Sequence, residues 1–143
     1  MYIDKTKRGG RKCIRCKSPI PAGEYTIVRG DTVDRNGNIC ILCLKNLLDI
    51  HNKKAENKKG WTFYADGIFS EQTCGICKGK IEKGSPAVIT KFKWTTIKFG
   101  RPVQDINPTI KYMCMCCVKQ VVECAEEEGM LETASMYRFE KLI

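Results

Sequence analysis

The ten cysteines of this 143-residue chain are the residues whose type and spacing could do chemistry. Eight of them form four Cys-x-x-Cys pairs, a spacing that brings two sulfurs to one metal ion. Four thiolates about 2.3 Å from Zn²⁺ close a tetrahedral site with no open position, so such a site is structural rather than catalytic. The sequence therefore predicts two structural zinc ions, held by Cys13, Cys16, Cys40 and Cys43 and by Cys74, Cys77, Cys114 and Cys117.

Other uses of the same cysteines fit the pattern less well. A disulfide scaffold is typical of secreted chains, and the N-terminal residues lack the apolar core of a secretory signal. A thioredoxin-like centre needs one Cys-x-x-Cys near a βαβ pattern, which the sequence does not show. Ligation within each half is favoured over a RING-like cross-brace because each half is already complete. Iron–sulfur clusters use the same ligands, so the sequence leaves that metal open.

Two further cysteines and the single histidine lie outside the predicted ligand sets. Cys117 keeps the two-residue spacing from Cys114, so we expect Cys116 to be a spare thiol beside the metal. We expect Cys124 to be a small buried residue. His51 falls on the apolar stripe of a predicted helix, which indicates a residue of the core or its rim rather than a ligand or a catalytic base.

The chain also repeats itself. A shift of 61 residues places Cys13 and Cys16 on Cys74 and Cys77, and a shift of 74 places Cys40 and Cys43 on Cys114 and Cys117. Apolar positions around the pairs follow the same shifts. The shifts differ by 74 − 61 = 13, so the second copy carries about 13 extra residues between its halves. The sequence therefore predicts a tandem of one zinc-binding unit.

Each unit follows one order of elements. A Cys-x-x-Cys knuckle precedes a β-branched stretch, Tyr25–Val28 or Ala87–Thr90, that predicts a strand. In the first unit Asn36-Gly37 predicts a tight hairpin turn. The second pair then opens a helix, whose apolar residues recur at i, i+3, i+4 and i+7. These residues are Leu44, Leu47, Leu48 and His51 in the first unit, and Val118, Val121, Val122 and Ala125 in the second.

This order of knuckle, hairpin and helix resembles the treble-clef zinc finger, in particular GATA-type DNA-binding fingers and the ClpX N-terminal zinc domain. Cys13-Ile-Arg-Cys16, the turn at Asp34–Asn38 and Ile39-Cys-Ile-Leu-Cys43-Leu carry the resemblance. It covers each unit, and the gaps of 23 and 36 residues between the pairs are longer than in short four-cysteine fingers. The resemblance implies a small α+β metal-stabilised fold of two tandem treble-clef units, the second with an extended hairpin.

We accordingly divide the chain into five segments. These are a basic N-terminal arm (1–9), the first unit (10–52), a basic and aromatic linker (53–70), the second unit (71–128) and a C-terminal tail (129–143). Within the linker, Asp66-Gly67 predicts a short hairpin.

The formal charge of +9 falls to +5 once eight thiolates and two Zn²⁺ are counted, since 9 − 8 + 4 = 5. Its distribution is more informative, because residues 1–60 hold 14 Lys and Arg against 6 Asp and Glu. In GATA-like fingers a helix and a basic tail contact DNA. Phe92 and Trp94 of the extended hairpin could stack on bases, grip a groove of a protein or cover the small core of the zinc unit. The predicted nucleic-acid contacts are Arg11, Lys12, Arg15, Lys45, Lys53, Lys54, Lys58, Lys59, Lys91, Lys93 and Trp94.

No Ser/His/Asp set, phosphate-binding glycine loop or carboxylate pair indicates an enzyme, and one histidine does not supply the chemistry of a His-Me nuclease. We expect a non-catalytic, intracellular regulator or adaptor, cytoplasmic or nuclear and without a membrane segment. It would bind nucleic acid through the first unit and protein through the second, as a transcription regulator or a virus-encoded host modulator. The alternative is a ClpX-like protein–protein interaction module that inhibits or redirects a host protein.

Overall fold

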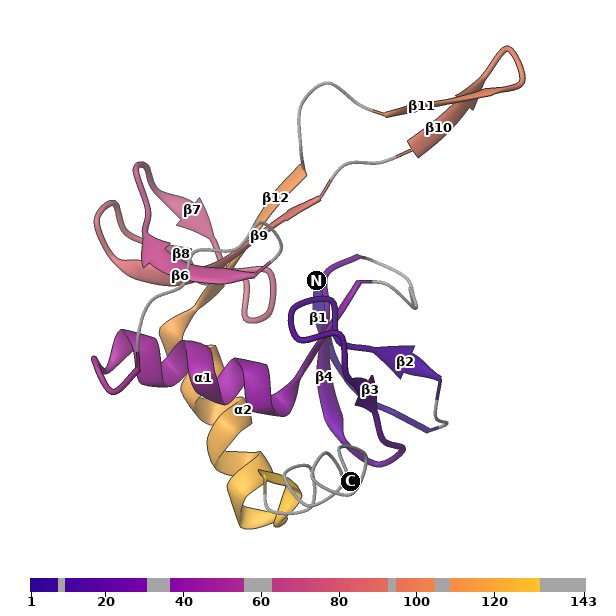
Figure 1. The fold of residues 1–143 in the computed structure, drawn as a ribbon. Coiled ribbons are helices and arrows are strands. Elements are labelled where there is room, and N and C mark those ends of the chain that lie inside the picture. The colour runs from indigo at the N-terminus through magenta and orange to yellow at the C-terminus, as the bar shows by residue number, and fades with distance from the viewer. Residues whose placement is uncertain (8–9, 31–36, 56–62, 93–94, 105–108, 132–143) are drawn as a thin grey trace.

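The computed structural model describes residues 1–7, 10–30, 37–55, 63–92, 95–104 and 109–131. Within these ranges the chain forms helices α1 (Ile41–His51) and α2 (Met115–Glu127) and several small antiparallel sheets (Figure 1). The predicted α+β class is confirmed. The predicted turn at Asn36 and the tail beyond residue 131 lie outside the described residues.

The first unit is a three-stranded sheet followed directly by α1. Strand β4 (Tyr25–Val28) is central, with β1 (Tyr2–Lys5) on one side and β5 (Asn38–Cys40) on the other. The knuckle lies between β2 (Arg11–Lys12) and β3 (Pro19–Ile20), which pair with each other. β5 ends at Cys40 and α1 begins at the next residue, so the same short segment is both a strand end and a helix start.

The second unit repeats this arrangement. Strand β9 (Pro86–Phe92) is central, between β12 (Thr109–Cys114) and β6 (Tyr64–Gly67), and α2 follows β12 directly. The second knuckle lies between the paired strands β7 (Gln72–Thr73) and β8 (Lys80–Ile81). Each unit is thus a sheet, a knuckle hairpin and a helix.

The repeat includes one strand more than the sequence predicted. β1 and β6 occupy equivalent edges, with Tyr2 opposite Val28 and Tyr64 opposite Ile89. Residues 2–5, assigned above to a basic arm, and residues 64–67, assigned to a linker, therefore belong to the sheets of the two units. The strands are related by a shift of 62 rather than 61, and this one-residue offset conceals them from a search at fixed spacing.

The predicted hairpin at Asp66-Gly67 is wrong. Strand β6 continues through both residues and pairs with β9, placing Gly67 opposite Pro86. Gly67 also lacks the positive φ that a tight Asp-Gly turn requires. Pairing with the central strand has outweighed the local turn preference of this dipeptide.

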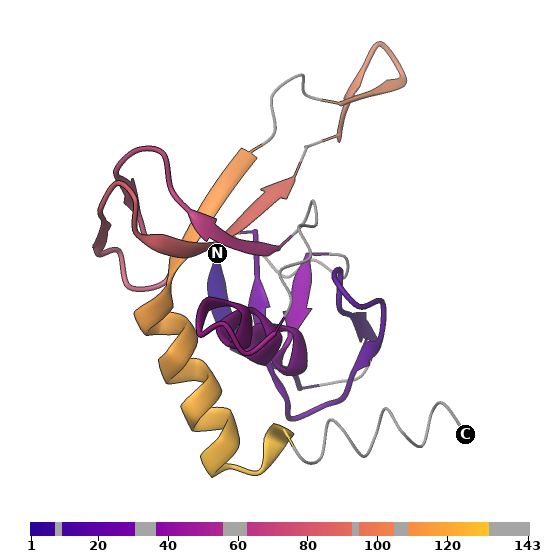
Figure 2. The ribbon, with the colours of Figure 1, turned by 60° about the vertical axis from the view of Figure 1, so that its left-hand side comes forward.

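The 13 extra residues of the second unit lie beyond the sheet. β9 and β12 pair over six residues, and β10 (Thr95–Lys98) and β11 (Arg101–Gln104) continue as a separate two-stranded sheet. Figures 1 and 2 show β10 and β11 extending away from the rest of the chain. We call residues 86–114 the ribbon.

The two units share one hydrophobic core. α1 packs against α2 and β6, and the buried apolar residues of both units form a single cluster. Its largest fully buried side chain, Phe63, immediately precedes β6. Met1 is also buried, because its side chain lies against Gly75 of the second knuckle. The units are therefore joined by packing as well as by the chain.

The helices differ in how well their apolar stripes were predicted. All four predicted residues of α2 are buried. In α1, by contrast, the stripe runs through Leu44, Leu47 and Ile50, while Leu48 is half-buried and His51 is exposed. His51, predicted to lie in the core or at its rim, is exposed, because it is the last residue of α1 and Ile50 rather than His51 faces the core there. Cys124, predicted to be buried, is exposed on α2.

Neither described helix combines the length and apolar character needed to cross a membrane.

The shared core predicts that the units unfold together. Leu47→Ala should destabilise the protein by about 2–5 kcal/mol, since it removes a fully buried side chain and leaves a cavity. Amide hydrogen exchange should then accelerate in α2 as well as in α1. Ile110→Ala, at an exposed position of β12, is the control and should cost less than about 1 kcal/mol. Faster exchange confined to α1 would contradict a common core.

Candidate metal centres

The structure brings the eight predicted cysteines together in two groups of four. In each group all four sulfurs lie within 4.8 Å of one another. The Sγ–Sγ distances are 3.6 Å for Cys13–Cys43 and 3.8 Å for Cys16–Cys40. In the second group they are 3.8 Å for Cys74–Cys117 and 3.9 Å for Cys77–Cys114.

These distances are a test of metal fit. Four sulfurs bonded at about 2.3 Å to one tetrahedral ion lie about 3.8 Å apart, while a disulfide would bring two of them to about 2.05 Å. In an iron–sulfur cluster the four cysteines do not all bind one iron, so some of their sulfurs lie further apart than around a single ion. The observed spacing fits a single four-sulfur ion at each centre, and the chain therefore has two sites suited to structural zinc.

Each knuckle is a backbone-bonded loop tied to the strand before the helix. In the first, Lys17 N–H donates to Cys13 C=O at 2.9 Å and Cys13 N–H donates to Ser18 C=O at 2.9 Å. Ile14 N–H donates to Asn38 C=O at 2.8 Å, which joins the knuckle to β5. The second knuckle repeats the three bonds, from Lys78 to Cys74, from Cys74 to Gly79 and from Gly75 to Tyr112.

The residue after each knuckle pair has an unusual backbone. Lys17 has φ 64° and Lys78 has φ 63°, in the left-handed region that few non-glycine residues adopt. The repetition of the same φ in both units shows that the knuckle geometry imposes it. This position turns the chain so that the loop closes around its sulfurs.

Backbone N–H groups point at the sulfurs of the first centre. Cys13 Sγ accepts from the N–H of Cys40 at 3.4 Å, and Cys40 Sγ accepts from the N–H of Cys43 at 3.4 Å, capping α1. Thiol hydrogen bonds with Cys13 and Cys16 raise the pKa of Cys40 and of Cys43. The hydrogen bond with Cys16 raises the pKa of Cys13, but the hydrogen bonds with Cys40 and Cys43 lower it by more, so that it falls to about 6. Four thiolates are thus mutually costly until a cation neutralises them.

The second centre has the same electrostatic design. Cys74 Sγ accepts from the N–H of Ile76 and of Cys114, each at 3.4 Å, and Cys77 Sγ accepts from Gly79 N–H at 3.4 Å. Burial raises the pKa of Cys74, but the backbone N–H donors lower it by more, to about 7. Such donors orient ligands and stabilise their negative charge.

A buried carboxylate that the sequence did not reveal supports the first centre. Glu24 is only 5% exposed, and its Oε1 accepts from the N–H of Ile41 at the start of α1. A carboxylate is favoured at a helix N-terminus, so Glu24 helps to hold the turn that carries Cys40 and Cys43. Its charge gave no sequence signal, because a lone Glu before a strand is usually solvated.

Three of the predicted nucleic-acid contacts are engaged within the protein. Arg11 Nη2 lies 2.8 Å from Asp4 Oδ2, and Arg15 Nη2 donates to Asn46 Oδ1 at 2.8 Å. Lys45 Nζ lies 2.8 Å from Asp49 Oδ1. Asp4 and Asp49 partly neutralise Arg11 and Lys45, and the bond to Asn46 holds the Arg15 side chain against α1.

The acidic end of α2 faces the first unit. Asp49 raises the pKa of Lys45, with Glu126 of α2 contributing through its charge. A hydrogen bond with Glu128 raises the pKa of Tyr25 on β4. Two acidic residues at the end of α2, Glu126 and Glu128, therefore lie near enough to the first unit to raise the pKa of its side chains.

The remaining predicted contacts are distributed differently. Lys12, Lys53 and Lys54 are exposed, and β2 lies at the opposite end of the first unit from the C-terminal end of α1 (Figure 1). Lys91 is half-buried with its Nζ 5.6 Å from the centre of the Tyr64 ring. The others, Lys58, Lys59, Lys93 and Trp94, lie outside the described residues.

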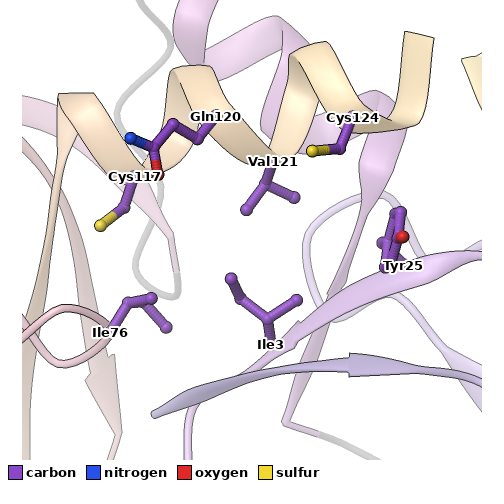
Figure 3. A pocket seen from close by; sticks show the side chains of 7 residues that line it. All are labelled: Ile3, Tyr25, Ile76, Cys117, Gln120, Val121 and Cys124. Carbon is purple, nitrogen blue, oxygen red and sulfur yellow. The ribbon is translucent and has the colours of Figure 1, made fainter. Parts of the chain in front are cut away.

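An apolar hollow of about 240 Å³ separates α2 from the first sheet. Figure 3 shows Val121 pointing into it from α2, with Ile3 on β1 and Ile76 on the second knuckle facing Val121. Tyr25 and Cys124 lie at one end. The hollow is therefore built from both units.

No model of a known protein family matches this chain, and a search of the curated proteins also found no match. The assignment of two structural metal sites therefore stands on the sulfur geometry.

The geometry predicts two zinc ions per chain. Elemental analysis of protein purified without added metal should return about two Zn and no visible iron chromophore. Chelation should unfold the chain, because binding energy at such sites is folding energy. The loss should be visible by circular dichroism and reversed by Zn²⁺. One zinc per chain, or full helicity after chelation, would contradict two structural sites.

The second prediction separates ligands from spare thiols. Cys117→Ser should lose one zinc and destabilise the second unit, since Cys117 is buried beside Cys74. Cys116→Ser is the matched control at the neighbouring exposed position and should retain both ions. Native mass spectrometry would measure the stoichiometry, and the opposite pattern would mean that Cys116 is the ligand.

Proposed function

We propose that this chain is a non-catalytic regulator or adaptor that binds nucleic acid, built on two treble-clef zinc units. The order of knuckle, sheet and helix around each sulfur group supports the treble-clef assignment. The observation that carries the nucleic-acid function is the segregation of charge along the fold.

Positive charge is concentrated in two parts of the chain. Residues 1–60 carry 14 Lys and Arg against 6 Asp and Glu, a net +8, and the ribbon carries 5 against 1, a net +4. The rest of residues 61–143 carries 11 − 5 = 6 basic and 10 − 1 = 9 acidic residues, a net −3. Positive charge concentrated in part of a chain is typical of proteins that bind phosphate backbones.

The contacts would come from the ends of the first unit rather than from the side of α1. Every residue from Ile41 to Ile50 is buried or half-buried, and the helix packs against α2 and β6. A recognition helix in the major groove needs an open face. The exposed cations Lys12, Lys53 and Lys54 supply phosphate contacts without such insertion.

A protein–protein interaction module is the second candidate. The hollow beside Ile3, Ile76 and Val121 favours it, because an apolar recess is suited to a nonpolar side chain of a partner protein. A pull-down from the native cell tests this candidate. Capture of a protein after nuclease treatment, by a chain with no affinity for nucleic acid, would favour it.

Neutralising exposed lysines of the first unit should weaken nucleic-acid binding. The variant is Lys12→Gln, Lys53→Asn and Lys54→Gln, with Asn chosen because Lys53 has φ 60°, a conformation that Asn tolerates. Each lost phosphate contact should reduce the slope of log K against log salt by about 0.9 on duplex DNA or about 0.7 on single strands. Fluorescence anisotropy over a salt series measures both affinity and slope.

The matched control removes three exposed lysines of the second unit outside the ribbon. Lys80→Gln, Lys83→Gln and Lys119→Gln change the net charge equally and should reduce the slope less. If both variants behave alike, general charge rather than the first unit governs binding. If the wild-type chain binds neither DNA nor RNA at low salt, the nucleic-acid function is wrong.

A further inference from the structure

The tip of the ribbon is a two-residue turn with an aromatic residue in an unusual conformation. Lys98 and Arg101 pair across it, so Phe99 and Gly100 alone join β10 to β11. Their φ values are 53° and 73°. Two positive φ values in a two-residue hairpin are those of a type I′ turn, for which Asn-Gly is the usual sequence.

Phe99 is unfavourable here for two independent reasons. A bulky side chain at positive φ is strained, and Asn at the same position would be tolerated. The Phe99 side chain is also fully exposed, so its apolar surface gains nothing from burial. Neither the turn nor the core accounts for an aromatic ring at this position.

The charge of the ribbon indicates what the ring would meet. Arg101 is exposed directly beside the turn, and the ribbon also contains four lysines against the single acidic residue Asp105. The net positive charge of the ribbon therefore attracts an acidic polymer. Nucleic acid combines that negative charge with flat bases on which an aromatic ring can stack.

We propose that Phe99 stacks on an unpaired base of a single-stranded nucleic acid while Arg101, exposed beside the turn, contacts a phosphate and the net positive charge of the ribbon attracts the strand. This inference rests on the proposed nucleic-acid function, and it assigns the binding of single strands to the ribbon of the second unit. Unpaired bases are favoured over a duplex, because a side chain that enters a duplex must first unstack a base step. A single ring, Phe99, offers little contact to offset that free energy.

Phe99→Asn tests the proposal without disturbing the turn, because Asn-Gly is the preferred type I′ sequence. Affinity for a labelled oligothymidylate or oligouridylate of about 20 nucleotides should fall roughly 5- to 150-fold, the equivalent of one lost stack. Affinity for a duplex of the same length should change less than about twofold. Phe99→Trp should retain or increase single-strand affinity.

Phe69 supplies the matched control. It is almost fully exposed and follows β6, outside the ribbon. Phe69→Asn should leave single-strand binding unchanged, which would separate the position of Phe99 from the general effect of removing an exposed aromatic ring. Photocrosslinking of a 5-iodouracil oligonucleotide should label the peptide that contains Phe99.

The outcomes distinguish the inference from the function on which it rests. If the lysine variant weakens binding but Phe99→Asn does not, the nucleic-acid function holds and the stacking proposal is overturned. An equal loss on duplex and single strand also overturns it, since the ring would then act on paired bases. Absence of any nucleic-acid binding by the wild-type chain overturns both.

Discussion

The structure depends on the attraction between thiolates and a metal cation. Without the ion, Cys40 and Cys43 have raised pKa values because the neighbouring sulfurs compete for charge. With it, each ion joins a knuckle to the first turn of a helix, and so links segments 23 or 36 residues apart. Among the described residues the sheets have two or three strands each, so the metal supplies stability that a larger core would otherwise provide. The phase of each helix follows from which cysteine must face the ion.

The second constraint is that each unit buries part of its apolar surface only by packing against the other unit. α1 packs on α2 and β6, Met1 lies against Gly75, and Glu126 and Glu128 of α2 raise the pKa of Lys45 and of Tyr25 in the first unit. The two zinc units therefore form a single core rather than two independent domains. Because such a core is close-packed, a change of volume at one helix also disturbs the packing of the other.

Much of this could be predicted from short-range patterns. Cysteine spacing identified the eight sulfurs, and the apolar period of Val118, Val121, Val122 and Ala125 identified the buried face of α2. The errors have physical causes. His51 was misplaced because it is the last residue of α1, where Ile50 faces the core instead. β1 and β6 were missed because edge strands of four residues carry little pattern, and Asp66-Gly67 favours a turn that the sheet overrides. Packing between the units depends on surfaces far apart in sequence.

The direct passage of β12 into α2 has a consequence for how the protein can vary in length. Cys114 is a strand end, a helix cap and a metal ligand at once, so no residue can be inserted at that junction without moving a sulfur. The tip of the ribbon, at the turn between β10 and β11, holds none of the eight cysteine ligands. Antiparallel strands can gain or lose one residue on each side and keep their register. Residues can therefore be added at the tip of the ribbon, and a new sequence could be grafted there while both metal centres stay intact.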